Sequence, residues 1–155
     1  MSKRFLTSLF LFLALTLNLT AQPGFYRGEM PKPKFVFLFI GDGMGLSQAS
    51  MAEAYLSTQK GEIANEALTF TSFPVMGIST TYSANSFITC SSAAGTALST
   101  GTKTNNGMLG VDPQGAKLES ISYAIHRAGV PVGIASSVTI DHATPAAFYA
   151  NSNSR

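Results

Sequence analysis

The sequence predicts an α/β fold built on a parallel β-sheet. Three segments, residues 35–40, 75–82 and 130–137, have the apolar or β-branched composition typical of strands that are buried in a sheet. Stretches with helix-forming composition separate them, and this alternation of strand and helix is the pattern of an α/β domain. With 155 residues, the chain fits a single domain of ordinary size.

The N-terminal segment precedes the predicted domain. Residues 1–22 begin with Lys3 and Arg4 and continue as an apolar run, which is the layout of a secretory signal peptide. A membrane anchor is the alternative, but the run of about 15 residues is shorter than the ~20 that span a bilayer. We therefore expect a secreted or periplasmic protein without a membrane anchor. Residues 23–34, rich in Pro, Gly and Lys, are predicted to be a linker into a domain at 35–155.

Three helices are predicted within this domain. Leu46–Leu56 is rich in Ala, Met and Ser, and Ser91–Thr100 consists almost wholly of small residues. A third helix is indicated by an apolar stripe at helical spacing, formed by Leu118, Ile121, Ile125 and Ala128. Gly129 follows directly, where a C-terminal glycine cap is expected.

The composition excludes several classes of protein. Hydrophobic residues make up 45% of the chain and charged residues only 12%, which is too apolar for a disordered chain. The net charge of +2 is too small to indicate a nucleic-acid partner. The single cysteine, Cys90, excludes an intrachain disulfide and a cysteine-rich zinc site.

The first candidate site residue is Asp42, in the motif GDGMG after the first predicted strand. Ligand sites in open α/β sheets gather at the carboxyl ends of the strands. An aspartate buried there needs a paired group or a cation, so Asp42 is a candidate metal ligand. A turn-forming aspartate is the alternative. The glycine spacing does not match the dinucleotide-binding fingerprint.

The second candidate is the hydroxyl of Ser91, at the start of the small-residue helix. A helix amino end presents free N–H groups to an anion, so a serine there could accept a phosphoryl group if a metal activated its hydroxyl. A simple N-cap is the alternative. The third candidate is the motif DHATP, where His142 and Thr144 would face one way in extended geometry. A capping Thr144 before Pro145 is equally compatible with this motif.

Together the three motifs resemble the alkaline phosphatase family, over almost the whole of residues 35–155. In chain order they read IGDGMG, ITCSSAAGTALSTGTKTNNGMLGVD and TIDHATPAAFYANSNSR. The resemblance implies a parallel-sheet core of the alkaline phosphatase type, with two zinc ions and one magnesium ion. It also implies hydrolysis of phosphate monoesters through a phosphoserine intermediate, and it is compatible with a homodimer.

The resemblance also implies a role for each candidate. Asp42 is similar to the carboxylate that bridges one zinc and the magnesium, and Ser91 is similar to the nucleophile. Thr144 resembles a magnesium ligand, and His142 falls beside the magnesium site. Arg155 resembles the arginine whose guanidinium binds two phosphate oxygens. Arginine can form such a bidentate contact because its N–H donors lie in a planar fork.

The sequence departs from the family pattern at Cys90, where the family usually has aspartate before the nucleophile. Sulfatases of the wider fold use the motif Cys-x-Pro-x-Arg, which Cys90 does not match, so we expect it to be a small packed residue. The chain has only two histidines, too few for the full set of zinc ligands. We therefore expect an N-terminal, incomplete part of the fold that is inactive alone.

Two other functions stay open for the complete protein. One is another phosphoryl or sulfuryl transferase of the same superfamily. The other is a non-catalytic module that binds phosphate or metal, which the residue at position 90 and the missing ligands favour.

Overall fold

The structure of the chain is a computed structural model that describes residues 32–63 and 66–155. It divides into two units, residues 1–39 and 40–155, and of the first only 32–39 are described. The predicted signal peptide and most of the predicted linker lie outside the described residues. Within the described ranges, no helix is both long enough and apolar enough to cross a bilayer.

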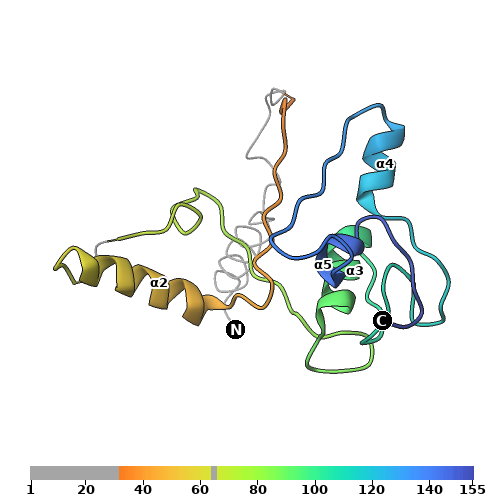
Figure 1. Ribbon diagram of the computed structural model, residues 1–155, viewed down its shortest axis with the longest axis horizontal. Coiled ribbons are helices and arrows are strands. Elements are labelled where there is room, and N and C mark those ends of the chain that lie inside the picture. Colours follow the sequence, from red (N-terminus) through yellow and green to blue (C-terminus); the bar gives the residue numbers. More distant parts are fainter. Residues whose placement is uncertain (1–31, 64–65) are drawn as a thin grey trace, which may run out of the picture. The chain divides into compact units, whose positions relative to one another are not determined.

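The described part of the chain contains four helices, labelled in Figure 1. They are α2 (Leu46–Gln59), α3 (Ser91–Thr100), α4 (Ile121–Arg127) and α5 (Ala143–Ala146). The bounds predicted for α3 are confirmed, and α2 begins where predicted and ends three residues later. The helix predicted from the apolar stripe is confirmed as α4, with Gly129 past its end at φ 82°.

The N-terminal limit of α4 differs from the prediction because Leu118 lies outside the helix. Its N–H donates to Gly110 O at 2.9 Å, and Ser120 at the N-cap has extended backbone angles. The prediction of extended geometry around Thr144 is wrong. This residue lies in the first turn of α5, where Pro145 is tolerated because that turn leaves its N–H groups unpaired.

Within the described residues, the three predicted strands do not pair into the expected parallel sheet. Only two isolated bridges occur there, Leu109 with Ser152 and Val111 with Lys117. In residues 35–39, alternate phenylalanine rings stack at centroid distances of 6.5 and 6.4 Å. Alternate side chains lie on the same side of an extended backbone, so this stacking indicates that the segment is extended. Within residues 32–63 and 66–155 the predicted strand segments have no element packed on their faces, so Phe39 is 88% and Ile78 95% exposed.

Helix α3 packs against α5 and α4, and Figure 1 shows α3 beside α5. Gly95 makes the closest approach, because a Cβ placed there would lie 2.9 Å from Ala147 Cβ. Ala143 and Ala147 are almost fully buried at this contact. The small residues of α3 therefore serve to bring two short helices together.

The loop after α3 folds back onto this helix pair. Thr96, which is fully buried, accepts a hydrogen bond from Gly110 N–H at 2.8 Å through its hydroxyl oxygen. Leu109 then packs with Ala146 and Ala147 in a small apolar core. This arrangement ties the 101–118 loop to both α3 and α5.

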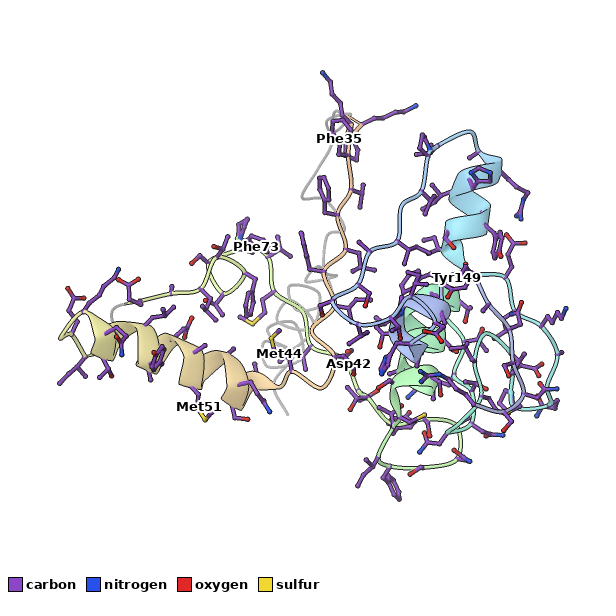
Figure 2. The ribbon with its side chains drawn as sticks, viewed as in Figure 1. Phe35, Asp42, Met44, Met51, Phe73 and Tyr149 are labelled. Atoms are coloured by element: carbon purple, nitrogen blue, oxygen red, sulfur yellow. The ribbon has the colours of Figure 1, made fainter. Side chains whose placement is uncertain are left out.

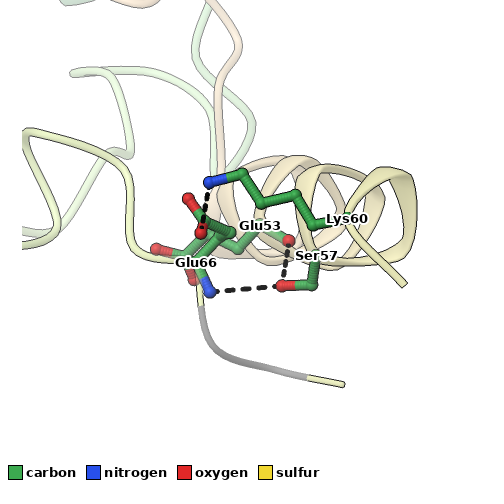
Figure 3. A network of polar contacts seen from close by, with 4 residues as sticks. All are labelled: Glu53, Ser57, Lys60 and Glu66. Atoms are coloured by element: carbon green, nitrogen blue, oxygen red, sulfur yellow. Dashed lines mark hydrogen bonds and ion pairs between the residues drawn. The ribbon is translucent and has the colours of Figure 1, made fainter. Parts of the chain in front are cut away.

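Helix α2 is held to the following segment by polar contacts, drawn in Figure 3. Ser57 Oγ donates to Glu53 O at 2.9 Å and accepts from Glu66 N–H at 3.2 Å. Lys60 Nζ forms an ion pair with Glu66 at 2.6 Å. Apart from Ala49 and Ser57, the residues of α2 are exposed or only partly buried.

Candidate active site

Asp42 lies in a tight turn after the extended segment. Met44 N–H donates to Gly41 O at 3.1 Å, which closes the turn. Gly43 has a φ of 68°, in the left-handed region where glycine is favoured because it lacks a Cβ. Figure 2 labels Asp42 at this position in the chain.

The Asp42 carboxylate accepts hydrogen bonds from two of the predicted site residues. Ser91 Oγ donates to its Oδ1 at 3.2 Å, and Thr144 Oγ1 donates to its Oδ2 at 2.9 Å. The partners are 49 and 102 positions away in the sequence. The structure therefore brings Asp42, Ser91 and Thr144 together, whereas their chemical roles stay predictions.

Ser91 is the first residue of α3. Cys90 before it has φ −107° and ψ 167°, so the backbone is extended up to the helix start. Ala94 N–H donates to Cys90 O at 3.0 Å, which is the first bond of the helix. The N–H groups before Ala94 have no intrahelical partner, and such groups attract anions.

The sulfur of Cys90 also takes part in hydrogen bonds. Gly107 N–H donates to Cys90 Sγ at 3.2 Å, and Ser92 Oγ lies 3.1 Å from the same atom. Burial raises the pKa of the Cys90 thiol, but the hydrogen bonds from Ser92, Gly107 and Ala93 outweigh it and hold the pKa below its ordinary value. The expected small packed residue is thus half-buried, and its sulfur also takes part in hydrogen bonds, which the sequence did not predict.

His142 is the N-cap residue of α5, two positions before Thr144. Its Nδ1 is buried and has no hydrogen-bond partner among the described residues. A buried ring nitrogen without a partner is costly, and a ligand would satisfy it. The predicted place of His142 beside the magnesium site stays a prediction.

Arg155 is exposed. In the described ranges, no hydrogen bond or ion pair joins it to the cluster at Asp42. The pKa of Asp141 is lowered, first by a hydrogen bond from the Thr139 side chain and to a smaller extent by the positive charge of Arg155. The predicted phosphate contact of Arg155 stays a prediction.

The donor set at Asp42 suits a hard divalent cation. A carboxylate and a hydroxyl are the oxygen ligands that magnesium prefers, and the orphaned Nδ1 of His142 is a further donor nearby in sequence. Zinc sites need three protein ligands, and among residues 32–63 and 66–155 no group of three His, Cys, Asp or Glu could hold a metal. The residues present thus fit part of a magnesium site and no complete zinc site.

One residue of this region was not singled out from the sequence. The side chain of Asn106, which the sequence indicates only as part of a loop with Asn105 and Gly107, bonds to the backbone on both sides of Thr89. An Asn-Gly pair signals a turn, but it carries no information on contacts about 16 residues away, because such contacts depend on the tertiary fold.

Comparison with known proteins shows similarity to one family. The family model described as alkaline phosphatase matches residues 33–155. Alkaline phosphatase 3 of Bacillus subtilis is 36% identical over 131 residues, which is 83% of this chain and 28% of the relative. The chain therefore spans less than a third of that relative's length.

Solved structures show the same partial match. The cold-active alkaline phosphatase of a psychrophilic Shewanella species superposes with a TM-score of 0.69 at 32% identity, covering 74% of this chain and 29% of that one. A histidine-to-glutamate mutant of the TAB5 alkaline phosphatase, solved with magnesium bound, gives a TM-score of 0.62 at 27% identity. This match covers 73% of this chain and 30% of the mutant. The fold of this part of the chain is thus that of the corresponding part of these enzymes.

Proposed function

The chain belongs to the alkaline phosphatase family, and on that premise we propose that the complete protein hydrolyses phosphate monoesters through a phosphoserine at Ser91. The single observation that carries the proposal is the shared carboxylate, because Asp42 accepts hydrogen bonds from both Ser91 and Thr144. A serine hydroxyl is a weak nucleophile at neutral pH, and an adjacent negative group with a cation is one way to activate it.

In the proposed reaction, Ser91 Oγ forms a bond to phosphorus while the bond from phosphorus to the alcohol oxygen breaks. The hydrogen bond to Asp42 Oδ1, 3.2 Å long, orients the hydroxyl, the carboxylate accepts its proton, and the departing alcohol oxygen takes up a proton from water. Ser91 is the first residue of α3, and the amino end of a helix favours a negative phosphoryl group. Water then cleaves the phosphoserine, which releases phosphate and restores Ser91.

We assign the magnesium ligands to Asp42 and Thr144, with His142 beside them. A divalent cation supplies positive charge that favours an ionised hydroxyl and a developing negative charge on phosphoryl oxygens. The two zinc ions that the family resemblance implies would take most of their ligands from outside the described residues. Arg155 is proposed to bind two phosphate oxygens, since its guanidinium is exposed and presents a fork of donors.

The proposal extends to the domain and the compartment. Residues 35–155 would carry the nucleophile part of the alkaline phosphatase domain, and residues 1–22 would direct export. The complete protein, purified from medium or periplasm, should then begin near residue 23 on N-terminal sequencing. An exported protein that retains Met1 would contradict the cleaved signal.

The proposed function is tested by trapping the intermediate. The complete protein is mixed with an aryl phosphate, zinc and magnesium, quenched in mild acid and digested, and phosphate is expected on the peptide that contains Ser91. Ser91→Ala should abolish this label. Ser92→Ala is the matched control, because Ser92 Oγ faces Cys90 Sγ and not Asp42, and it should keep the label.

Two outcomes would contradict the proposal. Label that survives in Ser91→Ala would mean that another group is the nucleophile. Tight binding of inorganic phosphate by the complete protein without any turnover would favour the non-catalytic module, the second candidate. The non-catalytic module is favoured by one observation, which is that Cys90 stands where the family usually has aspartate.

A further inference from the structure

The amide of Asn106 makes a two-point contact with the segment that leads into α3. Its Nδ2 donates to Ile88 O at 2.8 Å, and its Oδ1 accepts from Cys90 N–H at 3.1 Å. The carbonyl of one residue and the N–H two positions later point to the same edge of an extended chain. The Asn106 amide therefore donates one hydrogen bond to this edge and accepts one from it, as a neighbouring strand would.

Asn106 is itself held in place by the surrounding loop. Its N–H donates to Asn85 Oδ1 at 2.9 Å, and Thr104 O accepts from Ala84 N–H at 2.9 Å. Gly107, with φ 85°, occupies a tight turn that Met108 N–H closes by donating to Asn105 O at 3.1 Å. The amide group thus projects from a turn that is anchored on both sides.

From this contact we infer that Asn106 is a positioning residue for Ser91, an inference that rests on the proposed function. The two hydrogen bonds hold the backbone of Cys90 extended up to the first residue of α3. The direction of the Ser91 side chain is set by that backbone, and its Oγ must stay within 3.2 Å of Asp42 Oδ1. Asn106 acts through the backbone, because within the described residues its side chain hydrogen-bonds to Ile88 O and Cys90 N–H and not to Asp42.

Both atoms of the amide are needed for this role. Alanine removes the donor and the acceptor together. Aspartate has the same size and can still accept from Cys90 N–H, but it has no donor for Ile88 O and sets a carboxylate against that carbonyl. Both Asn106→Ala and Asn106→Asp should therefore make the backbone of residues 88–90, which leads into Ser91, more mobile.

The experiment measures formation of phosphoserine in the complete protein by rapid quench over a range of aryl phosphate concentrations. Asn106→Ala and Asn106→Asp should each slow phosphorylation at saturating substrate by about tenfold or more, because small misplacements of a nucleophile are costly. The KM should change by about twofold at most, because a positioning role acts on the chemical step. A merely structural role would instead lower the thermal midpoint and leave the rate per folded molecule unchanged.

Asn105→Ala is the matched control. Asn105 lies in the same turn, but its side chain donates to Pro113 O at 3.2 Å, away from the nucleophile segment. It should keep a native phosphorylation rate within about twofold. Native phosphorylation rates in both Asn106 variants would overturn the inference, as would an equal loss in the Asn105 variant.

Amide hydrogen exchange separates this inference from the proposed function. Exchange at the Cys90 N–H should be faster in Asn106→Ala than in Asn105→Ala, whether or not the protein is active. If the native protein forms no phosphoserine, the proposed function fails, and this exchange rate alone decides the inference. Unchanged protection of the Cys90 amide in Asn106→Ala would then overturn it.

Discussion

The pair formed by α3 and α5 and the extended apolar segments bury their side chains to very different extents. At the helix pair, Thr96 and Ala143 are fully buried, and the close approach at Gly95 is made within the chain itself. The segments predicted as strands expose large side chains such as Phe39 and Ile78. The helix pair is thus stabilised by contacts within the chain, whereas the extended segments have no paired strand among the described residues. The candidate site draws on both, because Asp42 follows an extended segment and its two partners lie on the helices.

The largest expected effect is at the closest helix contact. Gly95→Val should lower the free energy of unfolding of the complete protein by about 2–3 kcal/mol, because overpacking forces the helices apart. A Cβ alone would already meet Ala147 Cβ at 2.9 Å. Chemical denaturation measures the change. Leu98→Val on the exposed side of the same helix is the control and should cost about 0.5 kcal/mol. Equal losses in the two variants would show that the contact at Gly95 does not limit stability.

The next effect concerns the Asp42 carboxylate, which follows an extended segment and accepts hydrogen bonds from α3 and α5. Asp42→Asn removes a negative charge from the proposed magnesium site and should weaken magnesium binding about tenfold or more. Isothermal titration with magnesium measures this affinity in the complete protein. Asp112→Asn is the matched control, because Asp112 caps a separate turn by accepting from Gln114 and Ala116 N–H groups. Equal magnesium affinity in the two variants would remove Asp42 from the site.

A smaller effect is expected at the sulfur beside the nucleophile. Because hydrogen bonds hold the pKa of Cys90 below its ordinary value, its alkylation by iodoacetamide should reach half its maximal rate at a pH below that of a free thiol. Below this midpoint the thiolate, and the stability it contributes, should be lost as the pH falls. Ser92→Ala removes one of the hydrogen bonds and should shift the midpoint upward. A midpoint at or above that of a free thiol would contradict the hydrogen-bonded sulfur.

The smallest effect is expected on α2. The Lys60 side chain is 57% exposed in its ion pair with Glu66, so water screens the interaction. Lys60→Met should change the free energy of unfolding by about 0.5 kcal/mol or less. A loss as large as that of Gly95→Val would mean that α2 contributes to the cooperative core.

The helices could be predicted from the sequence where interactions between residues close in the chain determine them. The small residues of 91–100 and the glycine after 128 identified α3 and the end of α4. The sequence did not predict α5, because His142 and Thr144 were interpreted in extended geometry, although Pro145 fits the first turn of a helix. The sequence could not show whether the predicted strands pair, and within residues 32–63 and 66–155 they do not, since pairing depends on residues far apart. The same holds for Asn106, whose contacts reach back to residues 85–90.

The central claim is tested most directly by a crystal structure of the complete protein with magnesium and orthovanadate, which imitates a phosphoryl group in transfer. The account predicts vanadium bonded to Ser91 Oγ and a cation shared by Asp42 and Thr144. Vanadium bonded to Cys90 Sγ, or bound away from the start of α3, would contradict it.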